Sequence, residues 1–292
     1  MRRLSYTIPP EWGGRPLQDY LRQVQGYSRR MRVRLKHRPG SICRNGEPVR
    51  MVDLLRPGDL IEIRLEDDRQ TAGPGRPGLD APILYEDEDL VLYHKPPFMA
   101  VHPSRDHQED TLANVFCRHL LEQGQDRAVF RPVYRLDRDT EGLCLIAKNA
   151  LAAAKLAGRV EKEYVAILCG EDLPDEGRID APIAQLEPHR MQRGVRPDGQ
   201  LAVTHYRIVQ RGGGYAKAVI RLETGRTHQI RVHFSYLGYP LAGDSMYGGD
   251  CSHLNQQALC CRWIRFLHPT QEIYMEFCIN MQNKLDNLLH IE

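Results

Sequence analysis

Long apolar segments are missing from this chain of 292 residues. Nowhere do about 18 apolar residues follow one another, which is the length that a membrane-spanning helix requires. Residues 1–6 include two arginines and do not form the apolar segment of a signal peptide. The sequence therefore predicts a soluble protein without a membrane partner, and we expect it in the cytoplasm.

The cysteines lack the spacing of a metal site. There are eight, and none forms a C-x-x-C motif or has a neighbouring histidine pair. Because structural zinc sites use such spacing, we expect no metal. Cys144 and Cys169 interrupt apolar runs, so we expect buried, reduced thiols.

Positive charge is concentrated at the N-terminal end. Residues 1–66 hold 14 Lys or Arg and 7 Asp or Glu, a net charge of +7, whereas the remaining 26 basic and 31 acidic residues give −5. A basic module on a near-neutral body indicates a polyanionic partner, because neutralised phosphates release counterions. The length also fits two domains better than one.

The basic segment reads as a small domain over 1–68. Apolar spacing predicts a helix over 17–24, and Ser28 is a suitable N-cap for a second helix. A turn at Asn45-Gly46 and an alternating strand over 60–65 follow. This order resembles the S4-like RNA-binding domain. The resemblance implies RNA contacts from six cations: Arg29, Arg30, Arg32, Arg34, Lys36 and Arg38.

Residues 69–82 are rich in glycine and proline and have no apolar periodicity, which predicts a linker. We expect it to let the larger domain, 83–292, adjust its position. That domain opens with two short strands around the acidic run 86–89, which we expect to be solvated. Lys95 and His102 follow in a loop, where they can contact a substrate phosphate or fix the loop, the commoner role.

One carboxylate, Asp137, lies between two guanidinium groups. Arg135 and Arg138 favour its ionised form by Coulomb attraction, and the apolar run 143–147 predicts a buried strand behind the loop. These residues alone leave two interpretations open. One is a loop that holds an ionised acid; the other is a surface turn with ion pairs worth ~0–1 kcal/mol.

A second dense polar region covers 216–249. A predicted strand over 217–223 runs into a turn with Arg226, and Thr227 is a suitable N-cap for a helix that Gly238 ends. Such a turn can aim Arg226 into a cleft. The helix carries four more polar residues, for which we expect packing and RNA contacts: His228, Gln229, Arg231 and His233.

Several long motifs stand in an order that resembles the RluA-type RNA pseudouridine synthases. They are Arg135-Leu136-Asp137-Arg138-x-Thr140-x-Gly142-Leu143, Lys162-x-Tyr164-x-Ala166, Thr224-Gly225-Arg226-Thr227-His228-Gln229-Ile230-Arg231-Val232-His233, Gly243-Asp244 with Tyr247-Gly248, and His268-Pro269. The similarity spans about residues 83–278. It implies an α+β fold whose catalytic domain is built on a long mixed, mainly antiparallel sheet.

The resemblance further implies isomerisation of uridine to pseudouridine in ribosomal or transfer RNA, without a cofactor and by a monomer. Asp137 matches the catalytic aspartate, Arg226 the arginine that pairs with it, and Tyr164 the aromatic residue that stacks on the uracil. Substrate contacts are expected from further residues: Arg135, Arg138, Thr140, His102, Lys95, Thr227, His228, Gln229 and Arg231.

Two positions depart from the family pattern, since Tyr134 replaces the usual His and Glu141 the usual Ser. Glu141 adds negative charge near an anionic substrate. One alternative is therefore a catalytically silent RNA-binding or ribosome-assembly protein on the same scaffold. Another is a glycosidase that pairs Asp137 with Asp139 or Glu141, but a sugar hydrolase has no use for the basic module.

Overall fold

The structure, a computed structural model, describes residues 2–66, 71–125, 128–188, 190–280 and 287–290. The N-terminal elements are β1 (Arg2–Thr7), η1 (Pro10–Trp12), α1 (Leu17–Gln23), α2 (Arg29–Lys36), β2 (Ile42–Arg44), β3 (Glu47–Pro48) and β4 (Leu60–Leu65). The elements that follow are β5 (Ile83–Glu86), β6 (Leu90–Lys95), α3 (Leu112–Glu122), β7 (Glu141–Ala147), α4 (Ala150–Leu156), β8 (Glu161–Cys169), β9 (Glu176–Asp180), β10 (Ile183–Gln185), β11 (Arg193–Val195), β12 (Val203–Gly212), β13 (Tyr215–Leu222), α5 (Gln229–Tyr236), β14 (Leu259–Leu267), β15 (Tyr274–Cys278) and η2 (Asn287–His290).

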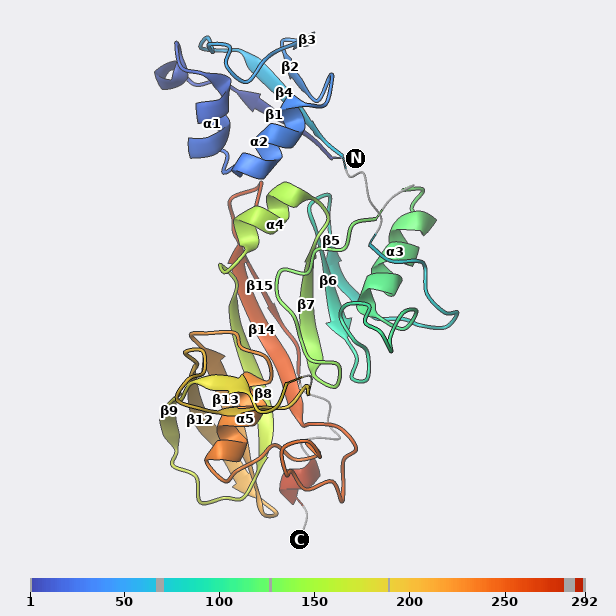
Figure 1. The fold of residues 1–292 in the computed structure, drawn as a ribbon, viewed down its shortest axis with the longest axis vertical. Helices are drawn as coiled ribbons and strands as arrows, with labels where there is room; N and C mark the ends of the chain where they lie inside the picture. The colour runs from blue at the N-terminus through green and yellow to red at the C-terminus, as the bar shows by residue number, and fades with distance from the viewer. Residues whose placement is uncertain (1, 67–70, 126–127, 189, 281–286, 291–292) are drawn as a thin grey trace.

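The N-terminal domain packs α1 and α2 against a four-stranded sheet in the order β1-β4-β2-β3 (Figure 1). The predicted N-cap of α2 is confirmed, because the Ser28 side chain accepts a hydrogen bond from the backbone N–H of Met31. The Asn45-Gly46 turn is also confirmed, and both residues have positive φ, as a tight hairpin requires. Strand β1 was not foreseen; it pairs with β4, almost 60 residues away in the sequence.

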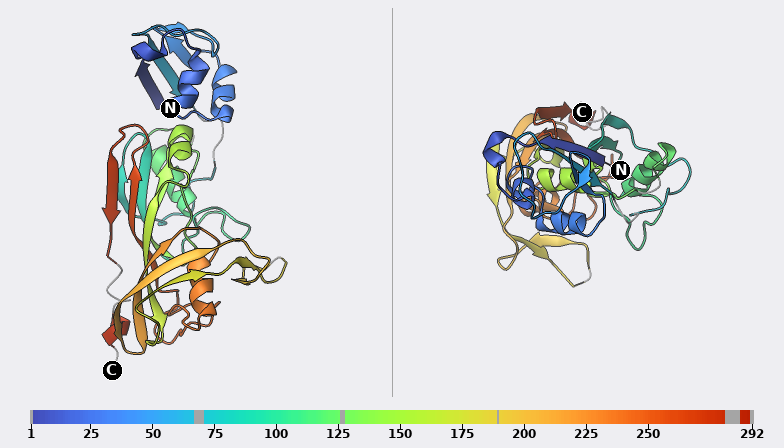
Figure 2. Two further views of the ribbon diagram at one scale, coloured as in Figure 1. Left: turned by 90° about the vertical axis from the view of Figure 1, so that its left-hand side faces the viewer. Right: turned by 90° about the horizontal axis from the view of Figure 1, so that it is seen from above.

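The large domain is built on a nine-stranded sheet in the order β5-β6-β7-β14-β8-β13-β12-β9, with β15 paired to β14. Among the described strands only β7 and β14 pair in parallel, so the predicted mixed, mainly antiparallel sheet and the α+β class are confirmed. Figures 1 and 2 show α3 and α5 beside opposite ends of this sheet. The Thr111 side chain caps α3 and the Asn149 side chain caps α4, which fixes where each helix starts.

Strand β7 forms the middle of this sheet and is buried along its whole length. Near its start, Gly142 has a φ of 124° and lies directly against the backbone of Cys261 in β14. A Cβ at this position would overlap that backbone. The close approach therefore requires glycine and fixes where the loop before β7 meets the sheet.

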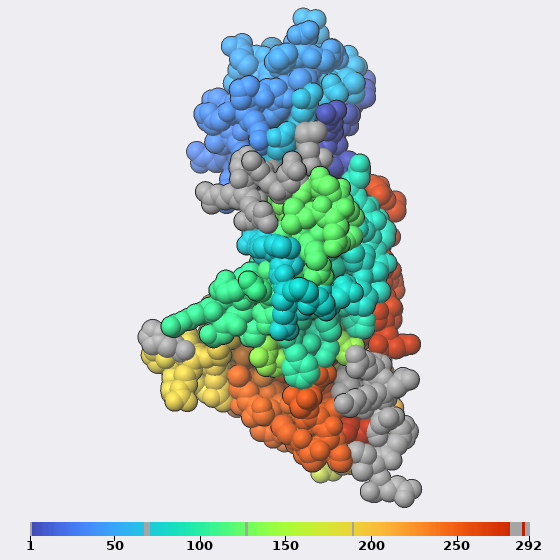
Figure 3. Space-filling model, turned by 90° about the vertical axis from the view of Figure 1, so that its right-hand side faces the viewer, coloured from blue at the N-terminus to red at the C-terminus, as the bar shows by residue number. Residues whose placement is uncertain are grey.

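The linker expectation needs a correction, because the described part of the linker packs on the large domain. The Thr71 N–H donates to the carbonyl of Ala128, and the Asn114 side chain donates to the carbonyl of Gly73. Residues 67–70 of the linker lie outside the described residues. The small domain itself forms a lobe at one end of the molecule, seated on the large domain (Figure 3).

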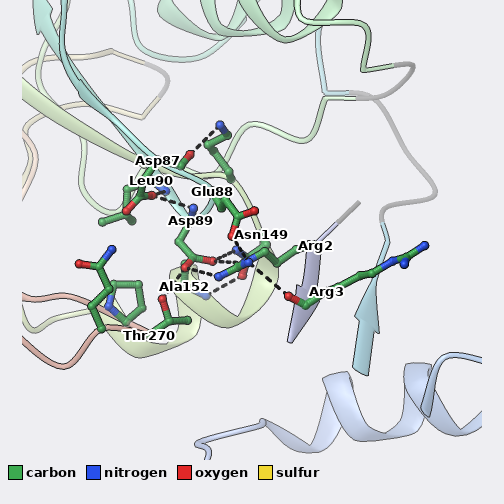
Figure 4. A network of polar contacts seen from close by, with 12 residues as sticks. Arg2, Arg3, Asp87, Glu88, Asp89, Leu90, Asn149, Ala152 and Thr270 are labelled. Atoms are coloured by element: carbon green, nitrogen blue, oxygen red, sulfur yellow. Dashed lines mark hydrogen bonds and ion pairs between the residues drawn. The ribbon is translucent and has the colours of Figure 1, made fainter. Parts of the chain in front are cut away.

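The acidic run before β6 is solvated at Glu88, whose side chain is 76% exposed, but the expectation is wrong for the rest of the run. Asp89 is only 2% exposed, and it forms a two-pronged ion pair with Arg2 of β1 (Figure 4). Asp87 accepts hydrogen bonds from the backbone N–H groups of Asp89 and Leu90. Glu86 contacts the Lys148 ammonium at 2.7 Å. The run is therefore where the two domains meet.

Candidate active site

The Asp137 side chain lies in the turn before β7 and is 27% exposed. The Thr140 N–H closes the turn on the Asp137 carbonyl at 3.2 Å. The buried Thr140 hydroxyl accepts a hydrogen bond from Gln257, so Thr140 helps to fix the loop. The predicted arrangement of a loop against a buried strand is confirmed.

Lys95 holds the same loop through hydrogen bonds from its buried ammonium group. Its side chain is fully buried, and its ammonium donates to the carbonyls of Pro96, Met99 and Arg138 at 2.8–2.9 Å. These contacts fit the alternative role of Lys95, that of a residue that fixes the loop. Burial lowers the pKa of Lys95 to about 8.

The guanidinium group that reaches Asp137 belongs to Arg231. Its Nη1 lies 3.4 Å from Oδ2 of Asp137, while its Nε and Nη2 grip Asp244 at 2.6 and 2.9 Å. Asp244 is 2% exposed, and the guanidinium also lies 4.9 Å from the centre of the Tyr247 ring. The fork on Asp244 fixes the orientation of Arg231 and leaves an N–H for Asp137.

The expected pairing of Asp137 with Arg226 is wrong. Arg226 is exposed, and its Nε donates to the carbonyl of Leu201 at 2.9 Å. The N-cap of α5 is not Thr227 but His228, whose backbone is left-handed, with a φ of 58°. Helix α5 therefore starts later than predicted, and Arg231 rather than Arg226 meets Asp137.

His228 lies on the other side of Oδ2 of Asp137, with its Nε2 4.0 Å away. Its Nδ1 forms a 2.9 Å hydrogen bond with the Tyr247 hydroxyl. Burial lowers the pKa of His228, although the charge of Asp137 opposes the shift. A neutral His228 contributes a dipole here, so Arg231 is the cation that faces the acid.

The remaining polar residues of α5 hold the fold together. The buried Gln229 side chain accepts from the backbone N–H of Arg226 and donates to the carbonyl of Val203. His233 is completely buried between Thr204 and the carbonyl of Ala181. These contacts confirm packing roles for both side chains and contradict the direct substrate contact expected of Gln229. Thr227 is half-buried in the turn.

Tyr164 of β8 lies across the sheet from Cys261, which in turn pairs with Gly142 of β7. Its side chain is buried in the large core and only 6% exposed. Burial raises its pKa well above the usual value, and the charge of Asp137 adds to the shift. Tyr164 therefore lies near Asp137 as a neutral phenol.

The arginines that flank Asp137 do not contact it. Arg138 pairs with Asp139 at 2.7 Å on the surface, and the Arg135 side chain is exposed. The expectation that these two hold Asp137 ionised is wrong, because neighbouring residues in a turn point in different directions. Both remain available to a substrate. His102 is half-buried, with its ring edge-on to Phe130.

The two residues that depart from the family pattern, Tyr134 and Glu141, each have a partner within the fold. The Tyr134 hydroxyl donates to the carbonyl of Leu143 at 3.0 Å. Glu141 is 1% exposed, and its Oε1 lies 3.0 Å from Nε2 of His94. Glu141 therefore does not add charge to an open surface, and neither residue displaces Asp137.

Asp244 and Tyr247 were part of a recognised motif but were given no role by the sequence. Their contacts with Arg231 and His228 show that they hold the cation beside Asp137. In the described residues, no three His, Cys, Asp or Glu side chains are placed to hold a metal ion. The described helices are all too short or too polar to cross a membrane.

The chain is similar to known RNA pseudouridine synthases. The sequence model of RNA pseudouridylate synthases matches residues 89–236. The uncharacterised RNA pseudouridine synthase YjbO of Bacillus subtilis is 36% identical over 269 residues, covering 90% of this chain and 95% of that protein. The ribosomal large subunit pseudouridine synthase D of Pseudomonas aeruginosa is 33% identical, with 95% and 92% covered.

A solved structure also resembles the fold. Human RNA pseudouridylate synthase domain containing 1 matches with a TM-score of 0.57 and 25% identity, over 70% of this chain and 86% of that one. The matched segment of the sequence includes Asp137, Tyr164 and Arg231. The chain therefore belongs to the RluA-type family of RNA pseudouridine synthases and is an RNA-modifying isomerase.

Proposed function

We propose that this enzyme converts uridines of large-subunit ribosomal RNA to pseudouridine, with Asp137 as the catalytic aspartate and without a cofactor. The observation that carries the proposal is the contact between Asp137 and Arg231, whose orientation the buried Asp244 fixes. The choice of RNA is supported by the name of the Pseudomonas aeruginosa relative.

The reaction needs an ionised carboxylate at the ribose. Arg231 and His228 both approach Oδ2 of Asp137, so Oδ1 is the oxygen that these contacts leave for the substrate. The Arg231 side chain is 7% exposed and that of Asp137 27%, so the attraction between guanidinium and carboxylate is stronger here than between the same groups in water. An ionised Asp137 serves either to attack C1′ of the ribose or to remove a ribose proton and give a glycal.

The atoms balance without an external reagent. The bond from C1′ to N1 of uracil breaks, the base turns, and a bond from C1′ to C5 forms. The proton lost from C5 is matched by the proton gained at N1, so the product has the composition of the substrate. No oxidant, reductant or group donor enters this balance, which is why we propose cofactor-free chemistry.

Tyr164 is proposed to contact the uracil after the nucleotide leaves its helix. An aromatic contact can replace lost base stacking worth ~1–3 kcal/mol. Its raised pKa disfavours the phenolate that proton removal from C5 would need. We therefore assign Tyr164 to base binding rather than to that proton transfer.

The small domain is proposed to hold the RNA outside the site, as an S4-like domain would. Arg29, Arg30 and Lys36 are exposed on or beside α2. Arg38 pairs with Glu66, and Arg34 donates to the carbonyl of Glu66. Arg32 reaches the carbonyl of Gln18. We favour Arg29, Arg30 and Lys36 for phosphate contacts.

The test compares Asp137→Asn with Asp139→Asn, a matched change two residues away in the same loop. Each purified variant is incubated with unmodified large-subunit ribosomal RNA, and pseudouridines are mapped by sequencing. We expect Asp137→Asn to lower the rate by about 10³-fold or more, and Asp139→Asn to stay near wild type. Equal rates for wild type and Asp137→Asn would refute the role of Asp137. No pseudouridine from wild type would instead favour a silent RNA-binding protein.

A further inference from the structure

The contact between the two domains centres on Arg2. Its Nε and Nη2 donate to the two carboxylate oxygens of Asp89 at 2.9 and 3.1 Å, and its Nη1 contacts Glu88 (Figure 4). The Arg2 side chain is 19% exposed and that of Asp89 only 3%. A two-pronged pair with a buried carboxylate fixes both distance and orientation, unlike a single exposed contact.

Asp89 is itself held by two other parts of the large domain. Its Oδ1 accepts from the Asn149 side chain at 2.7 Å, and its Oδ2 accepts from the Thr270 hydroxyl at 2.5 Å. Asn149 also caps α4 through the backbone N–H of Ala152. Arg2 therefore attaches the small domain to a point where three segments of the large domain already converge.

An apolar contact accompanies the ion pair. Leu151 of α4 is 1% exposed and belongs to the hydrophobic core of the small domain, together with Tyr27 and Met31. The stem of Lys155, on the same helix, lies against Gly26. Burial of Leu151 holds the two domains together but does not fix their relative orientation, because the hydrophobic effect is non-directional. The ion pair of Arg2 with Asp89 fixes that orientation.

The junction lies at one end of β7 and Asp137 at the other. Strand β7 has seven residues. At ~3.3 Å per residue it separates the two points by about 20 Å. Helices α1 and α2 lie toward the same side of the molecule as α5 in the left view of Figure 2. An RNA that enters the site can thus extend along this side to the basic helix.

We propose that Arg2 is a positioning residue for substrate selection: by docking the small domain, it fixes the spacing between α2 and Asp137 and so favours RNA long enough to meet both. This rests on the proposed function. When two binding modules are held at a fixed spacing, an RNA bound by one meets the other at a high effective concentration. A small domain that moves freely lowers this effective concentration.

The docking is tested first without RNA. Arg2→Ala removes the pair, and Arg3→Ala is the matched control, because Arg3 is the exposed neighbour on the same strand and loses the same charge. Small-angle X-ray scattering should show a larger radius of gyration for Arg2→Ala than for wild type and Arg3→Ala. Thermal unfolding of the three proteins checks that each domain remains folded.

Selection is tested with two RNAs that contain the same target uridine. One is a large-subunit ribosomal RNA transcript, and the other is a hairpin too short to reach the small domain. We expect Arg2→Ala to raise KM about tenfold on the transcript and less than about twofold on the hairpin, with kcat unchanged on both. Arg3→Ala should leave the ratio of the two KM values as in wild type.

The outcomes separate this inference from the proposed function. Identical scattering of Arg2→Ala and wild type, or an equal change of KM on both RNAs, overturns the role of Arg2. If wild type forms no pseudouridine in either RNA, the proposed function fails. Affinities from electrophoretic shifts on the two RNAs then replace KM, with the same tenfold and twofold expectations deciding the role of Arg2.

Discussion

Arg231 and Arg2 each form a bidentate ion pair with a buried aspartate, but the two pairs have different roles. Arg231 holds Asp244 and turns its remaining N–H to Asp137, which is 27% exposed. Arg2 holds Asp89, whose oxygens are also taken by Asn149 and Thr270. A carboxylate whose oxygens all have partners joins parts of the structure. One approached on a single oxygen stays available for chemistry.

The largest expected effect is at Arg231. Arg231→Ala leaves Asp244 buried without its partner, which costs about 3–5 kcal/mol of unfolding free energy. Loss of the cation facing Asp137 should also lower kcat by about 10²–10³-fold. Arg231→Lys keeps the charge without the fork, so we expect the kcat loss with a smaller change in stability. Denaturant unfolding and single-turnover rates measure both, and an unchanged kcat in Arg231→Lys would contradict the comparison.

Lys95 sharpens the comparison because it is a buried cation held by carbonyls rather than by a carboxylate. Burial lowers its pKa from 10.5 to about 8, so the folded state disfavours the ammonium form. Stability from this group therefore rises as pH increases from about 8 to about 10.5, by on the order of 3 kcal/mol.

The measurement is the unfolding free energy of wild type minus that of Lys95→Met across this pH range. The difference cancels the cysteines and tyrosines that titrate in both proteins. It should increase with pH, and parallel curves would show that the charge is not buried as described. A phosphate contact would instead raise KM in the variant and leave stability unchanged.

Asp89→Asn tests whether the pair of Arg2 with Asp89 serves stability rather than chemistry. The amide keeps the shape but loses the charge that faces Arg2, so we expect a loss of about 2 kcal/mol of unfolding free energy. Because the junction lies about 20 Å from Asp137, kcat on a short hairpin should remain at the wild-type value. A drop in kcat without a drop in stability would mean that the two pairs are coupled.

Arg226→Ala should have the smallest effect. Its guanidinium contacts the carbonyl of Leu201 at an exposed position, and surface contacts of this kind contribute little. We expect kcat to stay within about threefold of wild type, against the large loss at Arg231. A loss at Arg226 as large as that at Arg231 would restore the pairing that the sequence predicted.

The sequence predicted the parts that depend on local chemistry. Ser28 caps its helix, the Asn45-Gly46 turn closes its hairpin, and β7 is buried as its apolar run indicates. Local side-chain and backbone preferences decide such features. The same preferences made Thr227 a reasonable N-cap, but tertiary packing holds His228 in a left-handed conformation and shifts the start of α5.

Long-range contacts escaped prediction. Arg231 reaches Asp137 across 94 residues, and Arg2 reaches Asp89 across 87. A charge pattern shows that a cation is present without showing which carboxylate it meets. The sequence showed that Asp244 belongs to a family motif, but it did not show that Asp244 pairs with Arg231. The sequence of the acidic run 86–89 is that of an ordinary polar turn and does not show that Asp89 contacts the small domain.

Gly142 sets a limit on how this enzyme can change. With no side chain between β7 and β14, the acid and the aromatic ring of the site are separated by a distance that backbone contact alone determines. Even one added methyl group would push the turn that carries Asp137 away from β14. Changes in RNA preference should therefore arise outside this contact, in the surface loops and the small domain, while position 142 stays glycine.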